Sequence, residues 1–395
     1  MKPNILLVGN LINEEGKLVK NGYVWIKNDK IHYVGTPTPF SPDEDVIRYT
    51  MPQDCIIIPG MIDIHIHGAA GADFMDGNEE ALEIVAKHLP AEGTTSFLAT
   101  TMTEETSVIH TALNTAANFI KQSRSPAAEM LGIHLEGPFI SPVRAGAQPT
   151  SFIQEPDVHL FKKFQESADD QIKLVTLAPE MDGGLELTKY LSSQDVIASI
   201  GHSDSSFVEV KAGIEAGISH VTHLFNGMRG IHHRDPGVAG AALLQQELMV
   251  EMIADGVHAS PEMIRLAYHS ISAERTVLIT DSMRAKGLGE GSYTLGGQQV
   301  TVTGNEARLI DGTLAGSILP MNAAVKNMMD YTQCSWSDIV KMTSENAAKE
   351  LRIFERKGSL SVGKDADITV LTEDSDVLMT FCRGELVYHR KGERV

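Results

Sequence analysis

The sequence predicts an α/β fold, a TIM-like (β/α)₈ barrel with a small β-sandwich domain formed by both ends of the chain. Three observations predict it. Short apolar runs alternate with stretches of helical character through the middle of the chain, whereas both ends are rich in short strand-like runs separated by polar turns. The length of 395 residues suits one large barrel with a small appendage.

The strand-rich ends predict the small domain. Near the N-terminus, turn pairs at 21–22 (Asn-Gly) and 28–29 (Asn-Asp) separate the expected strands. The expected strands of the two ends are 4–8, 23–27, 30–34, 366–371, 376–382 and 385–388. We therefore assign residues 1–59 together with 355–395 to the small β-sandwich domain, and residues 60–354 to the barrel domain.

The middle of the chain predicts the barrel, because each of eight strand-like runs is followed by a crossover. The expected strands are 61–67, 94–100, 130–136, 172–178, 196–202, 220–226, 249–255 and 276–281. The expected helices include 79–89, 104–122, 156–168, 206–216 and 261–272, several with plausible capping residues at Thr103, Asp204 and Ser260. Residues 292–309, with two glycines at 296–297, predict a hairpin after the eighth strand.

Composition excludes several classes of partner. The formal charge of −19 argues against binding to nucleic acid or to an anionic membrane, because either would be repelled. We expect no signal peptide and no membrane span, since no apolar run reaches the required length without charge. Cys55, Cys334 and Cys382 form no disulfide-like or CxxC spacing, and their thiols suit a reducing cytoplasm.

The strongest local signal lies at the end of the first barrel strand, in Asp63-Ile64-His65-Ile66-His67. Side chains alternate along a strand, so His65 and His67 point the same way with Asp63 below them. Two imidazoles this close on one face can both reach one metal ion. A His-x-His pair alone is also compatible with two chance histidines on an ordinary strand.

The other strand ends favour the metal interpretation. Glu136, His202, His223 and Asp281 lie at or near the ends of the third, fifth, sixth and eighth expected strands. Barrel enzymes place their active sites at the carboxyl ends of the strands, so these side chains are expected to converge. Imidazole and carboxylate ligands suit Zn²⁺, Fe²⁺, Mn²⁺ or Co²⁺, and this set is large enough for one or two ions per chain.

Two stretches resemble signatures of the amidohydrolase superfamily. They are Pro-Gly-x-Ile-Asp-x-His-x-His-Gly at 59–68 and Gly-Ser-Leu-Ser-Val-Gly-Lys-Asp-Ala-Asp-Ile at 358–368. Within it, the chain resembles the N-acetylglucosamine-6-phosphate deacetylases almost from end to end. The matching stretches are 131–139, 176–180, 201–203, 222–228, 234–237, 254–258 and 280–281.

The resemblance implies roles for the metal-binding residues. Glu136, His202 and His223 would hold the main ion, and His65 and His67 would complete a second site bridged by Glu136. Asp281 would lie in the same centre as a metal ligand and as the general base and acid, taking a proton from the attacking water and giving it to the departing amine.

The resemblance also implies a phosphosugar substrate and a homodimer. Asn226, Gly227, His258, Ala147 and Gln148 would line the substrate site. Arg234 would grip the phosphate of the neighbouring subunit's substrate. Many family members carry a histidine where this chain has Gln148, and it helps to polarise the acetyl carbonyl; we hypothesise that a second metal ion supplies that polarisation here.

The predicted function is therefore hydrolysis of N-acetylglucosamine 6-phosphate to glucosamine 6-phosphate and acetate, in amino-sugar catabolism and cell-wall sugar recycling. The alternatives are the same reaction on N-acetylgalactosamine 6-phosphate, another amidohydrolase reaction, or a non-catalytic protein on the same fold. The expected fourth strand ends at 176–179 without a lysine, which favours the Glu-bridged deacetylases over amidohydrolases bridged by a modified lysine. His134 could support Glu136 or be a core histidine, and His220 is expected to be structural.

Overall fold

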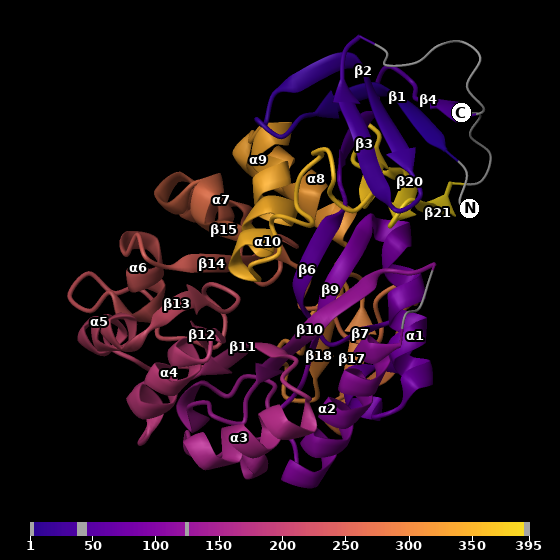
Figure 1. Cartoon of the computed structure of the whole chain (residues 1–395). Coiled ribbons are helices and arrows are strands. Elements are labelled where there is room, and N and C mark those ends of the chain that lie inside the picture. The colour runs from indigo at the N-terminus through magenta and orange to yellow at the C-terminus, as the bar shows by residue number, and fades with distance from the viewer. Residues whose placement is uncertain (1–3, 38–45, 123–125, 391–395) are drawn as a thin grey trace.

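The structure is a computed structural model that describes residues 4–37, 46–122 and 126–390. Its centre is an eight-stranded sheet of parallel strands in the order β15-β14-β13-β12-β11-β10-β9-β6 (Figure 1). The strands are β6 (Met61–Ile66), β9 (Thr94–Thr100), β10 (Glu129–Glu136), β11 (Ile172–Leu177), β12 (Ile197–Ile200), β13 (Ile218–Val221), β14 (Met249–Ile253) and β15 (Thr276–Ile279). The prediction of a (β/α)₈ barrel is confirmed.

The first and last barrel strands are joined by individual hydrogen bonds rather than by a ladder. The backbone N–H of Asp281 donates to the carbonyl of His65 at 2.8 Å. The Thr280 hydroxyl donates to Oδ2 of Asp63 at 2.5 Å, and Oδ1 of Asp63 accepts from the backbone of Thr280 at 3.3 Å. Asp63 therefore connects the His-x-His strand to the strand that carries Asp281.

The barrel strands are buried along most of their length, as parallel strands covered on both faces should be. Their interior is polar. The hydroxyl of Thr222 is hydrogen-bonded to the hydroxyls of Thr176 at 2.7 Å and Ser199 at 2.6 Å. The Thr176 hydroxyl also lies 2.7 Å from Nε2 of His134. His134 is thus a hydrogen-bonded core histidine. Its ring packs edge-on against His65, so it lies next to the predicted metal ligands.

Helices cover the outside of the barrel (Figure 1). They are α1 (Glu79–His88), α2 (Thr106–Lys121), α3 (Val158–Ser167), α4 (Gly184–Ser193), α5 (Phe207–Ala216), α6 (Gly237–Leu244), α7 (Pro261–Ile271), α8 (Met321–Thr332), α9 (Trp336–Val340), a π-helical turn (Lys341–Glu345) and α10 (Asn346–Glu350). None of the helices in the described ranges combines the length and apolar character needed to cross a membrane.

Two of the three predicted capping residues are wrong. Helix α2 follows Glu105 rather than Thr103, and α5 follows Ser206, whose side chain forms a capping box with Glu209. Asp204 instead pairs with two arginines, described below. Ser260 does precede α7, although its side chain makes no capping hydrogen bond.

Strands from both chain ends form a second hydrogen-bonded sheet, in the order β21-β20-β19-β5-β1-β2-β3 with β4 beside β1. They are β1 (Ile5–Ile12), β2 (Leu18–Lys27), β3 (Lys30–Gly35), β4 (Ile47–Thr50), β5 (Ile56–Pro59), β19 (Ile368–Leu371), β20 (Val377–Cys382) and β21 (Glu385–His389). The indigo and yellow strands lie together at one end of the molecule around their own apolar core (Figure 1). The domain limits at 59/60 and 354/355 stay a prediction.

The predicted hairpin at 292–309 is a three-stranded antiparallel sheet. Its strands are β16 (Gly291–Leu295), β17 (Gln298–Thr303) and β18 (Glu306–Leu309). Apolar residues of this insertion pack with Met102 and Met283 in a small separate core. Two further short strands, β7 (Gly68–Ala69) and β8 (Ala72–Asp73), follow the first barrel strand. Leu295 and Arg308 of the three-stranded insertion line the pocket of the candidate site.

Candidate active site

The predicted metal ligands lie at the carboxyl ends of five barrel strands. His65 and Glu136 lie within β6 and β10, whereas His202, His223 and Asp281 follow the last residues of β12, β13 and β15. The latter three have positive φ angles of 46°, 31° and 47°. Residues other than glycine rarely adopt this conformation, and such strain gathers at functional sites. The strained turns aim the three side chains inward, and they explain why the predicted strands 196–202 and 220–226 end earlier than expected.

Glu136, His202 and His223 form the first cluster of ligand atoms. Nε2 of His202 lies 3.2 Å and Nε2 of His223 lies 3.1 Å from Oε1 of Glu136, and the two Nε2 atoms are 3.1 Å apart. All three side chains are buried.

His65, His67 and Asp281 form the second cluster, on the other side of Glu136. Oδ1 of Asp281 lies 3.2 Å from Nε2 of His67 and 3.5 Å from Nε2 of His65. Glu136 reaches this cluster too, with Oε2 at 3.3 Å from His67 and Oε1 at 3.5 Å from His65. One carboxylate therefore faces both clusters, as the predicted bridge requires.

The ligand atoms of both clusters, which are histidine Nε2 atoms and carboxylate oxygens, fit a bound cation. Nδ1 of His202 donates to the carbonyl of Arg144 at 2.9 Å, and Nδ1 of His67 lies 3.3 Å from the carbonyl of Thr100. Since a carbonyl only accepts, the Nε2 atoms of the neutral rings carry lone pairs that face carboxylate oxygens. Nε2 of His65 is buried and has no hydrogen-bond partner. Such converging acceptors need positive charge between them, and divalent ions take this ligand set.

The electrostatics agree. Burial alone would lower the pKa of His67, but Asp281 and Glu136 raise it to about 9. Burial alone would raise the pKa of Glu136, but His65, His202 and His223 hold it well below its usual range. The site therefore attracts protons when no other cation neutralises its carboxylates.

A pocket of about 350 Å³ opens onto the two clusters. Gly227 lines it with a φ of +55°, and a Cβ at this position would lie 2.8 Å from Nδ1 of His202. Only glycine therefore lets the loop after β13 approach the histidine this closely. The other predicted site residues in this pocket are His67, Glu136, Ala147, Gln148, His202, His223, Asn226, His258 and Asp281.

Gln148 is held between the backbone and the shared carboxylate. Its Oε1 accepts from the N–H of Thr103 at 2.7 Å, and its Nε2 donates to Oε2 of Glu136 at 2.8 Å. The amide of Gln148 thus orients the Glu136 carboxylate that faces both clusters.

Asp255 orients the ring of His258. Its Nδ1 lies 2.6 Å from Oδ2 of Asp255, which leaves Nε2 free of that contact. Burial alone would lower the pKa of His258, but the Asp255 carboxylate raises it. A protonated imidazole at the pocket wall suits an anionic group.

Arg234 is a predicted site residue that lies outside both clusters and outside the lining of the pocket. It is exposed, and its Nη1 lies 2.6 Å from Nε2 of His233 in the turn at 232–235. In this position the guanidinium does not line the pocket of its own chain.

The prediction missed Arg308 and Glu251. Arg308, on β18, lines the pocket, while its Nε pairs with Glu306 at 2.7 Å. No motif marks it. Glu251 is buried in the middle of β14, where a carboxylate in the apolar run Met249–Ile253 could have been recognised as a group that needs a partner.

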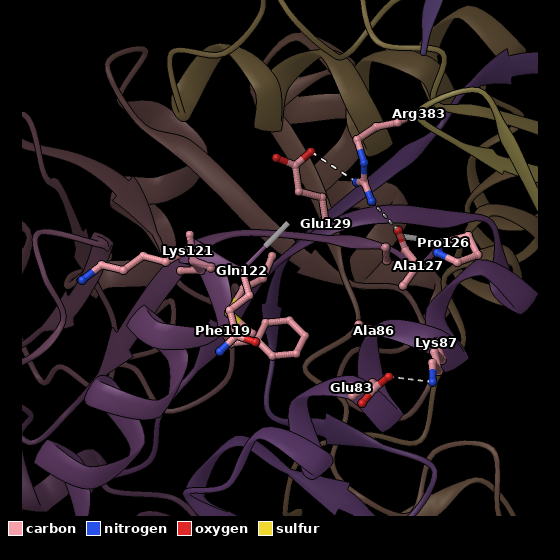
Figure 2. Close-up of a pocket in the computed structure, with 13 residues that line it drawn as sticks. Glu83, Ala86, Lys87, Phe119, Lys121, Gln122, Pro126, Ala127, Glu129 and Arg383 are labelled. Atoms are coloured by element: carbon pink, nitrogen blue, oxygen red, sulfur yellow. Dashed lines mark hydrogen bonds and ion pairs between the residues drawn. The ribbon is translucent and has the colours of Figure 1, made fainter. Parts of the chain in front are cut away.

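A larger cavity of about 450 Å³ lies elsewhere, among α1, the end of α2 and the start of β10. Four of its charged side chains pair with one another: Lys87 with Glu83 at 2.7 Å, and Arg383 with Glu129 at 3.5 Å (Figure 2). No histidine is among the described residues that line it. Size alone therefore does not identify the reactive site.

Comparison with known proteins agrees with the site. A sequence profile described as the amidohydrolase family matches residues 56–387, and the chain belongs to that family. The chain is 50% identical over 393 residues to the N-acetylglucosamine-6-phosphate deacetylase of Bacillus subtilis (strain 168), covering 99% of each chain.

Solved structures lead to the same group. The D267A mutant of N-acetyl-D-glucosamine-6-phosphate deacetylase from Mycobacterium smegmatis, in complex with N-acetyl-D-glucosamine-6-phosphate, superposes with a TM-score of 0.91 at 29% identity, covering 98% of this chain and 100% of that one. The N-acetylglucosamine-6-phosphate deacetylase from Thermotoga maritima gives a TM-score of 0.87 at 34% identity, with the same coverage.

Proposed function

We propose that this chain hydrolyses N-acetyl-D-glucosamine 6-phosphate to D-glucosamine 6-phosphate and acetate. The observation that carries the proposal is the pair of ligand clusters that share Glu136 and open onto one pocket with Asp281 at its edge. The full-length similarity to deacetylases of this substrate supports it. The chemistry is hydrolysis of an acetamide, with the amine as the leaving group.

The clusters would hold one or two divalent ions, with Zn²⁺, Fe²⁺, Mn²⁺ and Co²⁺ as candidates. Glu136, His202 and His223 would hold one, and His65, His67 and Asp281 the other. A bound ion supplies Lewis acidity that polarises the acetyl carbonyl and acidifies the attacking water. The two-ion hypothesis predicts that protein loaded with one ion per chain works below full rate, because Gln148 is engaged by Glu136 and Thr103.

Asp281 is the proposed proton carrier. Burial alone would raise its pKa, but His65 and His67 hold it below the ordinary value, so the carboxylate is ionised at neutral pH. It can accept a proton from the attacking water and then release it to the amine nitrogen as the C–N bond breaks. Its strained backbone keeps the carboxylate at the pocket edge.

The part of the pocket lined by Asn226, Gly227, His258 and Arg308 is the proposed phosphosugar site. Asn226, Gly227 and His258 offer polar groups of the chain itself, and Arg308 adds a guanidinium near them. We propose that the partner subunit of a homodimer completes the site with its own Arg234, since this exposed residue lies outside the pocket of its own chain. The buried thiols of Cys55, Cys334 and Cys382 suit the proposed cytoplasmic location.

Acetate release tests the proposed reaction. The metal-loaded protein is assayed with N-acetylglucosamine 6-phosphate, its galactosamine isomer and unphosphorylated N-acetylglucosamine. We expect the phosphorylated gluco compound to have the highest kcat/KM. Preference for the galactosamine isomer would replace the substrate assignment, and no release from any of them would reject deacetylation of these sugars.

Arg234→Ala is expected to raise KM for the phosphorylated sugar by about 10- to 100-fold with little change in kcat, because it removes charge-assisted hydrogen bonds to the phosphate. KM for the unphosphorylated sugar should not change. Arg265→Ala, at an exposed arginine on α7, is the matched control. Steady-state kinetics on both substrates provides the measurement.

Mixing subunits tests whether Arg234 acts across the dimer. Arg234→Ala and Asp281→Asn proteins are combined under conditions that exchange subunits. In a mixed dimer, the Arg234→Ala subunit keeps Asp281 and receives Arg234 from its partner, so kcat/KM should recover. If mixed dimers form and activity does not recover, Arg234 does not complete the neighbouring site.

A further inference from the structure

Glu251 is a carboxylate in the middle of the barrel, on the third residue of β14. Its side chain has no exposed surface, and its neighbours along the strand are apolar. A carboxylate in such a place destabilises a fold unless other groups satisfy it. Its contacts therefore indicate its role.

One oxygen of Glu251 contacts both clusters of ligand residues. Oε2 lies 2.9 Å from Nδ1 of His65, a ligand of the second cluster. The same oxygen accepts from the backbone N–H of His223 at 3.1 Å, and His223 belongs to the first cluster. β14 thus contributes no ligand itself but contacts one ligand of each cluster.

The contact with His65 fixes which ring nitrogen faces the site. An ionised carboxylate only accepts hydrogen bonds, so His65 donates from Nδ1. Its Nε2 then carries the lone pair, and this atom is buried, lacks a hydrogen-bond partner and lies 3.5 Å from both Glu136 and Asp281. A histidine that donates one nitrogen to a carboxylate is held in orientation and is a stronger ligand through the other.

His220 compensates the charge of Glu251, and a second carboxylate, Glu350, supports the histidine from its other side. Nε2 of His220 lies 3.4 Å from Oε1 of Glu251, and Nδ1 of His220 lies 3.1 Å from Oε2 of Glu350 on α10. Carboxylates on both sides favour the protonated form of His220. His65 can therefore serve as a neutral ligand while Glu251 stays ionised.

We propose that Glu251 is a positioning residue that orients His65 toward a metal ion and ties the second cluster to the backbone of His223 in the first. This inference rests on the proposed function, because it requires that both clusters bind divalent ions. It assigns to β14 the control of occupancy at the second metal position, since His65 is the ligand whose tautomer depends on Glu251.

Cobalt binding by full-length protein tests the proposal. Metal-free wild type, Glu251→Gln and Glu350→Gln are titrated with Co²⁺, with visible absorption and equilibrium dialysis as readouts. Glu251→Gln should weaken binding of one of two ions by about 10- to 100-fold, with loss of the matching absorption band. Glu350→Gln, which alters the same chain of contacts without touching His65, should bind both ions as wild type does.

Two results would overturn the proposal: normal binding of both ions by Glu251→Gln, or a single bound ion in wild type. If wild type with one bound ion releases acetate from the phosphosugar, the proposed reaction stands and only the proposed role of Glu251 fails. If Glu251→Gln does not fold, nitrogen NMR of the zinc-loaded wild type tests the proposal instead. The His65→Asn variant is used to assign the signals. We expect a proton on Nδ1 of His65, and a proton on Nε2 would contradict the role of Glu251.

Discussion

Replacement of Asp281 by asparagine is expected to lower kcat for N-acetylglucosamine 6-phosphate by about 10²- to 10⁴-fold, the range typical of a general acid–base group. An amide can neither accept the proton from water nor return it to the leaving amine. KM should change much less, because the substitution leaves the proposed substrate contacts of Asn226, His258 and Arg308 in place. Steady-state acetate release provides the measurement, from pH 9 down to below 3.8, the ordinary value from which the pKa of Asp281 is lowered.

The pH profile separates proton transfer from simple damage. The carboxylate acts in its ionised form and its pKa is held below the ordinary value, so wild-type activity should fall as pH drops through that lowered pKa. Asp281→Asn should lose this acidic limb. Metal content is measured on the same samples, since Asp281 also faces His65 and His67. A fully metallated variant that keeps more than about a tenth of wild-type kcat would contradict the assignment.

The sequence was sufficient to predict the barrel and the convergence of its ligands because both follow from the chain's periodicity. A parallel barrel brings the carboxyl ends of its strands together, so His65, Glu136 and Asp281 could be associated without coordinates. His65 and Asp281 belong to the second cluster, and Glu136 of the first cluster also faces the second. The terminal strands were predictable for the same reason, since short alternating runs bounded by turns need no long-range information.

Side-chain partners were less predictable, because they depend on which loops meet in space. Asp204 looked like a helix cap, yet it pairs at 2.7 Å with Arg144 and at 2.7 Å with Arg229, two loop residues distant in sequence. Two guanidinium groups satisfy this carboxylate more strongly than helix N–H groups would. The pocket residue Arg308 was missed similarly, because only the folded insertion brings it to the site.

The strained turns set a further limit. His223 was expected on a strand, whereas β13 ends at Val221 and a positive φ turns the histidine toward Glu136. A histidine in this conformation has no signature in a local sequence pattern, because tertiary contacts stabilise it. One such contact is the hydrogen bond from its N–H to Glu251, which comes from the neighbouring strand β14.

Removal of divalent ions is expected to abolish deacetylation, and return of Zn²⁺, Mn²⁺, Co²⁺ or anaerobic Fe²⁺ should restore it to different extents. Without ions the same side chains bind protons instead, since the carboxylates raise the pKa of His67 to about 9. Below that pH an entering ion must displace the proton, so metal affinity should fall as pH falls, by about tenfold per pH unit for each displaced proton.

Calorimetric titrations of the metal-free protein at pH 6, 7 and 8, each in two buffers of different ionisation enthalpy, count the released protons. Glu136→Gln, which removes the charge facing both clusters, should bind metal far more weakly at every pH. Affinity independent of pH over this range would show that the imidazoles are not ligands, whereas undiminished turnover by metal-free protein would exclude metal-assisted hydrolysis.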